Sequence, residues 1–76
     1  MDSKRESVRR QVSQFAETDY RYGTGTLRIM IDHIDWSRPF ESDGEHWYQV
    51  YGTEVTADDR EIGSRQALVR GRRLKN

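Results

Sequence analysis

The chain has 76 residues, no cysteine, and 13 basic against 13 acidic side chains. This length corresponds to one small domain, and the lack of cysteine excludes disulfide bridges and thiolate zinc sites as sources of stability. Because the net charge is zero and the chain holds two Trp, four Tyr and two Phe, we expect a folded domain. No apolar run matches a signal peptide or a membrane span, so the sequence predicts a soluble cytoplasmic protein without a membrane partner.

The zero net charge hides an uneven distribution along the chain. Residues 1–31 carry six basic and four acidic side chains, residues 32–63 carry two and nine, and residues 64–76 carry five and none. In one interpretation, the acidic middle and the basic C-terminal strand neutralise each other across a sheet. In the other, the basic ends gather on one surface that binds an anionic partner.

The N-terminal segment, residues 1–18, has the pattern of an amphipathic helix. It contains the capping-box sequence SKRE, and Val8, Val12 and Phe15 follow at spacings of four and three, on one helix face. Three large apolar residues cannot hold such a helix alone in water. We therefore expect this stripe to dock on the rest of the domain or, alternatively, to pair with a second copy in a homodimer.

The sequence pattern changes after this segment. Residues 19–25 contain two glycines and lose the helical spacing, so they are interpreted as a linker. From residue 26 the apolar period becomes two, which predicts a strand over residues 26–34. Residues 35–39 end in a proline, which cannot donate to a strand ladder, and we expect a loop or a sheet edge there.

Two turn signals divide the second half of the chain. Asp43-Gly44 favours a type I′ hairpin turn, and the polar residues 57–60 indicate another turn. The strands expected around these turns are residues 40–42, 45–51, 53–56 and 61–69, with a bulge at Gly52. A helix followed by four to five short strands predicts a mainly β fold, a small antiparallel SH3-like barrel over residues 26–70 with a basic tail at 71–76.

No motif indicates catalysis or metal binding. His33 and Asp35 can share a strand face, but the chain has no cysteine and no Gly-x-Ser-x-Gly sequence to supply a nucleophile. Asp32 and His46 do not complete a metal-ligand pattern with them, and Gly23-Thr24-Gly25 lacks the rest of a phosphate-binding fingerprint. We therefore expect a non-enzymatic binding domain with no metal and no cofactor.

Aromatic side chains are the first group of candidate binding residues. Trp36, Phe40, Trp47, Tyr48 and Tyr51 lie within sixteen residues of one another. Strand alternation places Trp47 and Tyr51 on one face and Tyr48 on the other. Either all five aromatic side chains fill the core, or one set stays on the surface; Trp36 and Tyr48 are the predicted aromatic contacts with a partner.

Basic side chains are the second group. The predicted phosphate-binding residues are Arg65, Arg70, Arg72, Arg73 and Lys75, together with Arg9 and Arg10 of the N-terminal segment. The alternative is a basic terminus that is simply solvated. The sequence thus favours a nucleic-acid-binding accessory domain that uses basic termini and hairpin aromatics. The alternative function is a protein-interaction module or small structural subunit. Its acidic hairpins, its exposed aromatic face or the apolar stripe of the N-terminal segment would then contact another protein or a second copy of the chain.

Overall fold

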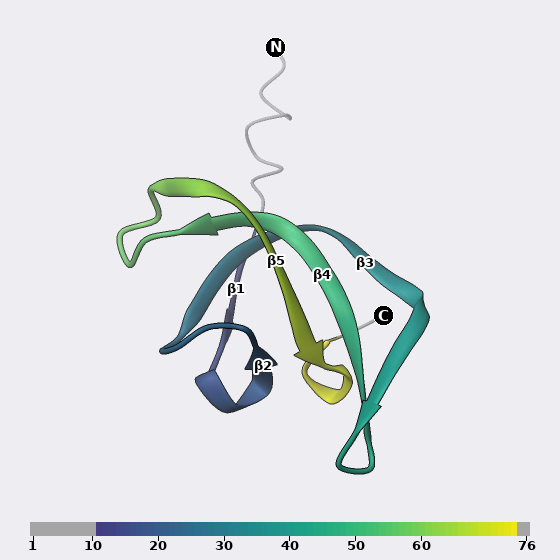
Figure 1. Cartoon of the computed structure of the whole chain (residues 1–76). Coiled ribbons are helices and arrows are strands. Elements are labelled where there is room, and N and C mark those ends of the chain that lie inside the picture. Colours follow the sequence, from purple (N-terminus) through teal and green to yellow (C-terminus); the bar gives the residue numbers. More distant parts are fainter. Residues whose placement is uncertain (1–10, 75–76) are drawn as a thin grey trace.

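The structure is a computed structural model, and it describes residues 11–74 of the chain (Figure 1). The elements are β1 (Val12–Phe15), the 3-10 helix η1 (Glu17–Asp19), β2 (Tyr20–Arg21), β3 (Leu27–Ser42), β4 (Glu45–Val55), β5 (Glu61–Arg70) and the 3-10 helix η2 (Gly71–Arg73). The predicted antiparallel β class is confirmed. Within residues 11–74, no helix has the length and apolar character needed to cross a membrane.

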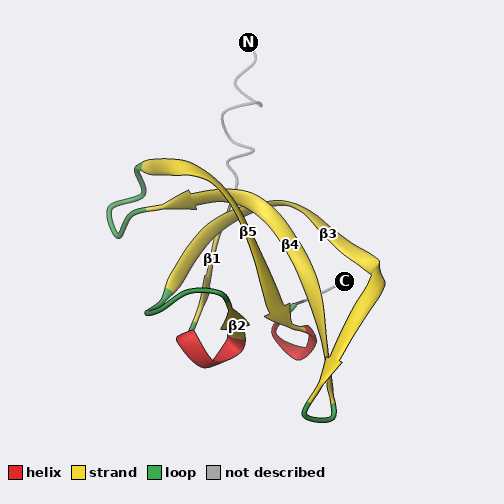
Figure 2. Ribbon diagram, viewed as in Figure 1, coloured by secondary structure: helices red, strands yellow, loops and turns green. Residues whose placement is uncertain are grey.

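The five strands form one antiparallel sheet in the order β1-β3-β4-β5-β2. Its two edge strands, β1 and β2, follow each other in the chain and are joined by η1 alone. Phe15 of β1 is in register with Leu27, and Tyr20 of β2 is in register with Val69. The short connection holds the two sheet edges close together, so the sheet curls into a nearly closed barrel, which supports the SH3-like class (Figure 2).

The core lies inside the curled sheet. Its buried cluster consists of Phe15, Tyr20, Leu27, Ile29, Val50, Ala67, Val69 and Leu74. The period-two pattern that predicted the first long strand is confirmed, because Leu27 and Ile29 are 1% and 0% exposed. Leu74 follows the last strand, so the chain end that was predicted to be a tail contributes a side chain to the core.

The predicted N-terminal helix is wrong for the part of it that the structure describes. Residues 12–15 form β1, and Val12 and Phe15 are in register with Met30 and Leu27. A helix here could bury only three apolar side chains. As a strand, β1 instead forms hydrogen bonds with the backbone N–H and C=O groups at the edge of β3. Tertiary pairing therefore overrides the helical spacing. Val8, the third residue of the stripe, lies outside the described residues.

The predicted linker at residues 19–25 is partly structured. Asp19 ends η1 and is 8% exposed, and Tyr20 begins β2 and is 5% exposed. The Tyr20 hydroxyl donates to the carbonyl oxygens of Thr24 and Gly25, at 3.1 and 2.9 Å. These bonds close the turn that leads from β2 into β3.

The predicted interruption at residues 35–39 is a distortion within one strand. β3 continues to Ser42, but its register with β4 shifts between Asp35 and Phe40. Pro39 explains the shift, because it has no backbone N–H to donate. Figure 1 shows the sharp bend in this part of β3. At the end of the strand, Asp43 and Gly44 have φ angles of 55° and 76°, which confirms the type I′ turn.

The predicted bulge at Gly52 lies instead on the opposite strand. The register passes from Ile31–Gly52 to His33–Tyr51, so the irregularity is in β3 at Asp32. Gly52 has a different role. A Cβ atom on this residue would lie 2.1 Å from the carbonyl oxygen of Met30, so the close approach of β3 and β4 requires glycine.

Candidate binding surfaces

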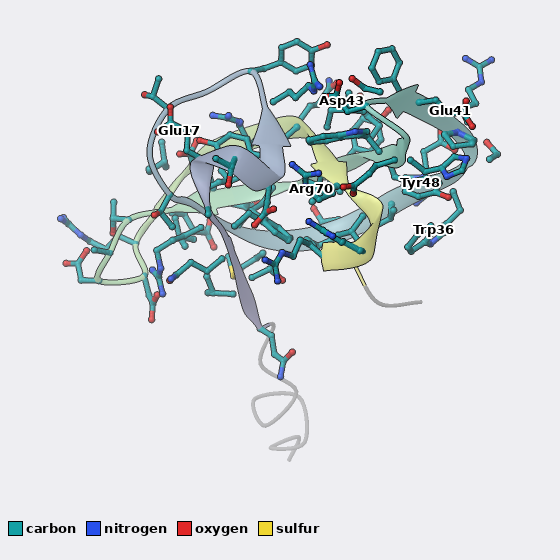
Figure 3. The ribbon with its side chains drawn as sticks, turned by 90° about the horizontal axis from the view of Figure 1, so that it is seen from below. Glu17, Trp36, Glu41, Asp43, Tyr48 and Arg70 are labelled. Carbon is teal, nitrogen blue, oxygen red and sulfur yellow. The ribbon has the colours of Figure 1, made fainter. Side chains whose placement is uncertain are left out.

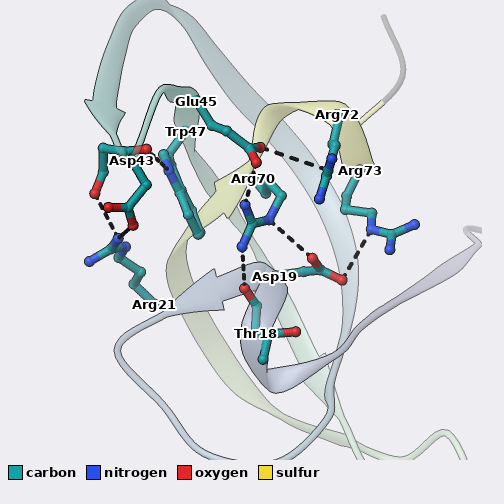
Figure 4. Close-up of polar contacts among 10 residues, drawn as sticks. Thr18, Asp19, Arg21, Asp43, Glu45, Trp47, Arg70, Arg72 and Arg73 are labelled. Atoms are coloured by element: carbon teal, nitrogen blue, oxygen red, sulfur yellow. Dashed lines mark hydrogen bonds and ion pairs between the residues drawn. The ribbon is translucent and has the colours of Figure 1, made fainter.

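A network of ion pairs holds the C-terminal arginines against the barrel (Figure 4). Arg70 Nε donates to Asp19 Oδ1 at 3.1 Å, and Arg73 Nε donates to Asp19 Oδ2 at 3.1 Å. Arg70 also donates through Nη1 to Glu45 Oε2 at 2.7 Å and through Nη2 to the carbonyl oxygen of Thr18 at 2.8 Å. Because the side chains of Asp19 and Arg70 are only 11% and 17% exposed, this network is shielded from salt.

Most arginines of the described chain are paired with a carboxylate. Residues 11–74 contain eight arginines, and seven of them form the pairs Arg21–Asp43, Arg28–Asp59, Arg60–Asp58, Arg65–Glu54, Arg70–Asp19, Arg72–Glu45 and Arg73–Asp19. The uneven charge along the sequence is thus balanced by contacts within the domain. Arg38 is the eighth, and it has no ion pair among these residues.

Trp47 lies on the outer face of the sheet, yet it is only 2% exposed. The guanidinium groups of Arg21 and Arg70 both lie 4.6 Å from its ring centroid (Figure 4). Its indole N–H donates to the carbonyl oxygen of Ser42 at 3.4 Å. Trp47 is therefore covered by two cation–π contacts and is a structural residue of this face.

The two aromatic residues predicted to contact a partner lie together at one end of the barrel. The ring centroids of Trp36 and Tyr48 are 4.8 Å apart with an interplanar angle of 59°, and Figure 3 shows both side chains beside η2. They line a pocket of about 340 Å³ together with Glu45, His46, Gly71, Arg72 and Leu74. Trp36 is 38% exposed, and Tyr48 packs against the core.

A second groove lies on the outer face of the sheet. It is lined by Tyr22, Asp35, Arg38, Phe40, Gln49, Tyr51 and Leu68, and its volume is about 290 Å³. Asp35, Gln49 and Leu68 are in register across β3, β4 and β5, so they form its floor. Tyr22 and Phe40 stand at the groove with exposed fractions of 74% and 49%.

The backbone at Tyr22 has a strained conformation. Tyr22 has a φ angle of 78°, in the left-handed region. This conformation is unfavourable in free energy for a residue with a Cβ atom. Its carbonyl oxygen accepts a bond from Arg65 Nη2 at 3.1 Å, and this bond helps to hold the turn. A large aromatic side chain therefore stays in solvent on a strained turn.

Asp35 lies at the floor of this groove, and hydrogen bonds stabilise its ionised form. Its Oδ1 accepts bonds from the Ser37 hydroxyl at 2.6 Å and from the Ser37 backbone N–H at 3.1 Å. The pKa of Asp35 is lowered by these two bonds, with smaller contributions from the charges of Arg38 and His33. His33 does not bond to Asp35 and instead stacks on Tyr51, with ring centroids 5.7 Å apart.

The structure places the predicted site residues in three groups. Arg70 and Arg73 are held by Asp19, and Arg65 by Glu54, while Arg72 and the two aromatics Trp36 and Tyr48 line one pocket. Phe15 is in the core, and Val12 is partly buried in β1. Val8, Arg9, Arg10 and Lys75 lie outside the described residues.

The sequence pattern did not indicate the outer groove. Alternation did place Trp47 and Tyr51 on the opposite face from Tyr48, as the structure shows. Phe40 belonged to the same aromatic cluster, but the loop or sheet edge expected at residues 35–39 left its face unassigned. The tyrosine followed by Gly-Thr-Gly was a turn signal, and it could have indicated that Tyr22 is exposed.

Comparison with known proteins gives no match, since no protein family, curated protein or solved structure is significantly similar to this chain. Among residues 11–74, no group of three or more His, Cys, Asp or Glu side chains could hold a metal ion.

Proposed function

We propose that this chain is a protein-interaction module that binds an extended peptide in the outer groove. The observation that carries this proposal is the position of Tyr22 and Phe40, two large exposed aromatic side chains that line one groove with Tyr51. Aromatic-lined grooves on small β domains suit extended and polyproline II segments, whose conformation leaves little entropy to lose on binding.

Charge supports a peptide with an acidic residue. Arg38 lines the groove, is exposed, and has no ion pair among the described residues. Asp35, the acidic neighbour, already accepts two hydrogen bonds from Ser37. The Arg38 guanidinium is thus the charged group that is available to a partner. We therefore expect the peptide to place a carboxylate at Arg38, and not a lysine or arginine at Asp35.

The pairing of the other arginines favours a protein partner over a nucleic acid. A phosphate would have to displace Asp19 from Arg70 or Glu54 from Arg65, and each of these cations is at most 23% exposed. Nucleic-acid binding along the whole basic C-terminal segment stays a prediction. Within this fold it would need the loss of several existing contacts.

The test is a two-dimensional amide NMR titration with three acetylated peptides. All three share one proline- and leucine-rich sequence, with Glu, Gln or Lys at one central position. We expect shifts at Tyr22, Arg38, Phe40 and Tyr51, and the tightest binding by the Glu peptide. Arg38→Gln should make the affinities of the Glu and Gln peptides equal, because it removes the positive charge that favours the Glu peptide.

A matched pair of variants locates the site. Phe40→Ala should weaken binding of the Glu peptide by at least about fivefold, since it removes an exposed aromatic contact. Ile62→Ala should leave binding unchanged, because Ile62 is equally apolar and 60% exposed but lies outside the groove. Absence of shifts with all three peptides, or equal effects of the two variants, would refute a peptide site here. Shifts at Arg65 and Arg70 on addition of an oligonucleotide, together with no shift on addition of the peptides, would favour the nucleic-acid function instead.

A further inference from the structure

The pocket at the barrel end has a different chemistry from the outer groove. It combines a partly exposed indole, Trp36, with the exposed guanidinium of Arg72. We propose that this pocket binds a single nucleotide unit, with the base stacked on Trp36 and a phosphate on Arg72. The chemistry is the same for a free nucleotide and for an unpaired nucleotide in a single strand.

The aromatic part of the pocket is held in place before a ligand arrives. Tyr48 packs against the core cluster, and Trp36 packs against Tyr48 with ring centroids 4.8 Å apart. Tyr48 thus supports the indole from the core side, while Trp36 keeps 38% of its surface exposed. Every nucleobase has a π face, so such a platform is tolerant of sequence.

The backbone of η2 brings a cation to this platform. A Cβ atom at Gly71 would lie 2.9 Å from both the Tyr48 ring and the carbonyl oxygen of His46. Glycine therefore lets η2 lie against Tyr48. The next residue is Arg72, which lines the same pocket as Trp36.

Arg72 is the C-terminal arginine most available to an anion. Its side chain is 67% exposed, and its Nε lies 3.7 Å from Glu45 Oε1. Glu45 is already bonded to Arg70 at 2.7 Å, so it stays neutralised when Arg72 turns to a phosphate. Arg73, in contrast, is bonded to the buried carboxylate of Asp19. One planar platform and one available cation fit one nucleotide unit better than a duplex backbone, which several phosphates would have to anchor.

The experiment follows the two indole N–H signals by NMR during titration with adenosine 5′-monophosphate, adenosine and a single-stranded octaadenylate. The monophosphate should shift the Trp36 signal and leave that of Trp47, which is 2% exposed, in place. Adenosine should bind at least about threefold more weakly, because it lacks the phosphate. Tighter binding of the octaadenylate than of the monophosphate would identify a strand as the ligand, and equal binding would identify a free nucleotide.

Two variants and a matched control separate stacking from charge. Trp36→Ala should weaken binding of the monophosphate by about fivefold or more, as expected for loss of base stacking. Arg72→Gln should make the affinities of the monophosphate and adenosine equal. Arg60 is an exposed arginine outside the pocket, so Arg60→Gln should change neither affinity. Thermal melting of each variant confirms that it folds.

A shift of Trp47 in place of Trp36, or a phosphate preference that survives Arg72→Gln, would overturn the nucleotide site. So would the absence of any shift at millimolar monophosphate. None of these outcomes affects the peptide groove, because its variants, Phe40→Ala and Arg38→Gln, lie in a different surface.

Discussion

Asp19 and Arg70 are separated by 51 positions in the sequence, yet their side chains are joined by a hydrogen-bonded ion pair of 3.1 Å. This contact links η1, between the two edge strands, to the end of β5. Arg73 binds the other oxygen of the same carboxylate. The Asp19 carboxylate therefore joins η1 to the end of β5 through Arg70 and to η2 through Arg73. The two 3-10 helices lie at the same end of the barrel (Figure 2).

Loss of the Asp19 carboxylate should be costly. Asp19→Asn removes the charge from a buried site and leaves Arg70 with less compensation, so we expect a loss of about 3 kcal/mol in unfolding free energy. Asp43→Asn is the matched control, because Asp43 is 84% exposed and lies 3.8 Å from Arg21. We expect that change to cost about 0.5 kcal/mol or less. Urea denaturation measures both, and equal effects would show that the Asp19 network does not stabilise the fold.

The C-terminal end should behave as part of the core. Leu74 is 9% exposed and belongs to the core cluster. Leu74→Ala should therefore lower the unfolding free energy by about 2 kcal/mol or more, from lost burial and the cavity that remains. Ile62→Ala, at an exposed apolar residue, should have an effect below about 0.5 kcal/mol. A result of similar size for both variants would mean that Leu74 does not dock in solution.

Gly52 should tolerate no side chain. Gly52→Ala would place its Cβ atom 2.1 Å from the Met30 carbonyl oxygen, so β3 and β4 must separate at that point. We expect the free energy of unfolding to fall by about 3 kcal/mol, which is at the upper end for overpacked sites, because the backbone itself must move. Thr53→Ala, one residue further along β4, should cost about 1 kcal/mol or less. Thermal melting compares the two, and a Gly52→Ala protein as stable as Thr53→Ala would contradict the tight strand approach.

Tyr22 should show opposite effects on stability and on binding. Asparagine tolerates the left-handed backbone conformation at this position better than tyrosine does. We therefore expect Tyr22→Asn to raise the free energy of unfolding by about 1 kcal/mol. The same change removes an aromatic wall of the proposed peptide groove and should weaken peptide binding. Phe40→Ser should weaken binding without the gain, since only Tyr22 of the two has a positive φ. Calorimetric melting and the peptide titration measure the two effects separately.

Two aspartates should titrate at lower pH than ordinary aspartates. The pKa of Asp58 is lowered chiefly by the bond from the Thr56 hydroxyl, and that of Asp35 by the bonds from Ser37. Because these folded-state pKa values are depressed, the stabilisation is present above the unfolded pKa and is lost as the pH falls through the folded one.

Carboxyl-carbon NMR titration tests this assignment. Thr56→Val should raise the pKa of Asp58 and leave that of Asp35 unchanged, and Ser37→Ala should do the reverse. Each variant is thus the control for the other. If either substitution moved both pKa values equally, the hydroxyl bonds would not be the cause.

The amino-acid sequence by itself determined the features that depend on neighbouring residues. The period of two from residue 26 indicated that Leu27 and Ile29 face the core. Asp43-Gly44 indicated a type I′ turn because both residues accept a positive φ. The alternation of Tyr48 and Tyr51 likewise placed them on opposite faces. These features follow from local backbone geometry, which a short stretch of sequence specifies.

Only the tertiary structure decided what residues 12–15 and the C-terminal arginines do. Val12 and Phe15 have helical spacing, but in the structure they pair with the edge of β3. The hydrogen bonds of this pairing stabilise the segment more than a helix with so few apolar residues could. Arg70 and Arg73 resemble a free basic tail until Asp19 is brought beside them by the closure of the barrel. In both cases the deciding partner is distant in the sequence, and the free energy of the contact exists only after the chain has folded.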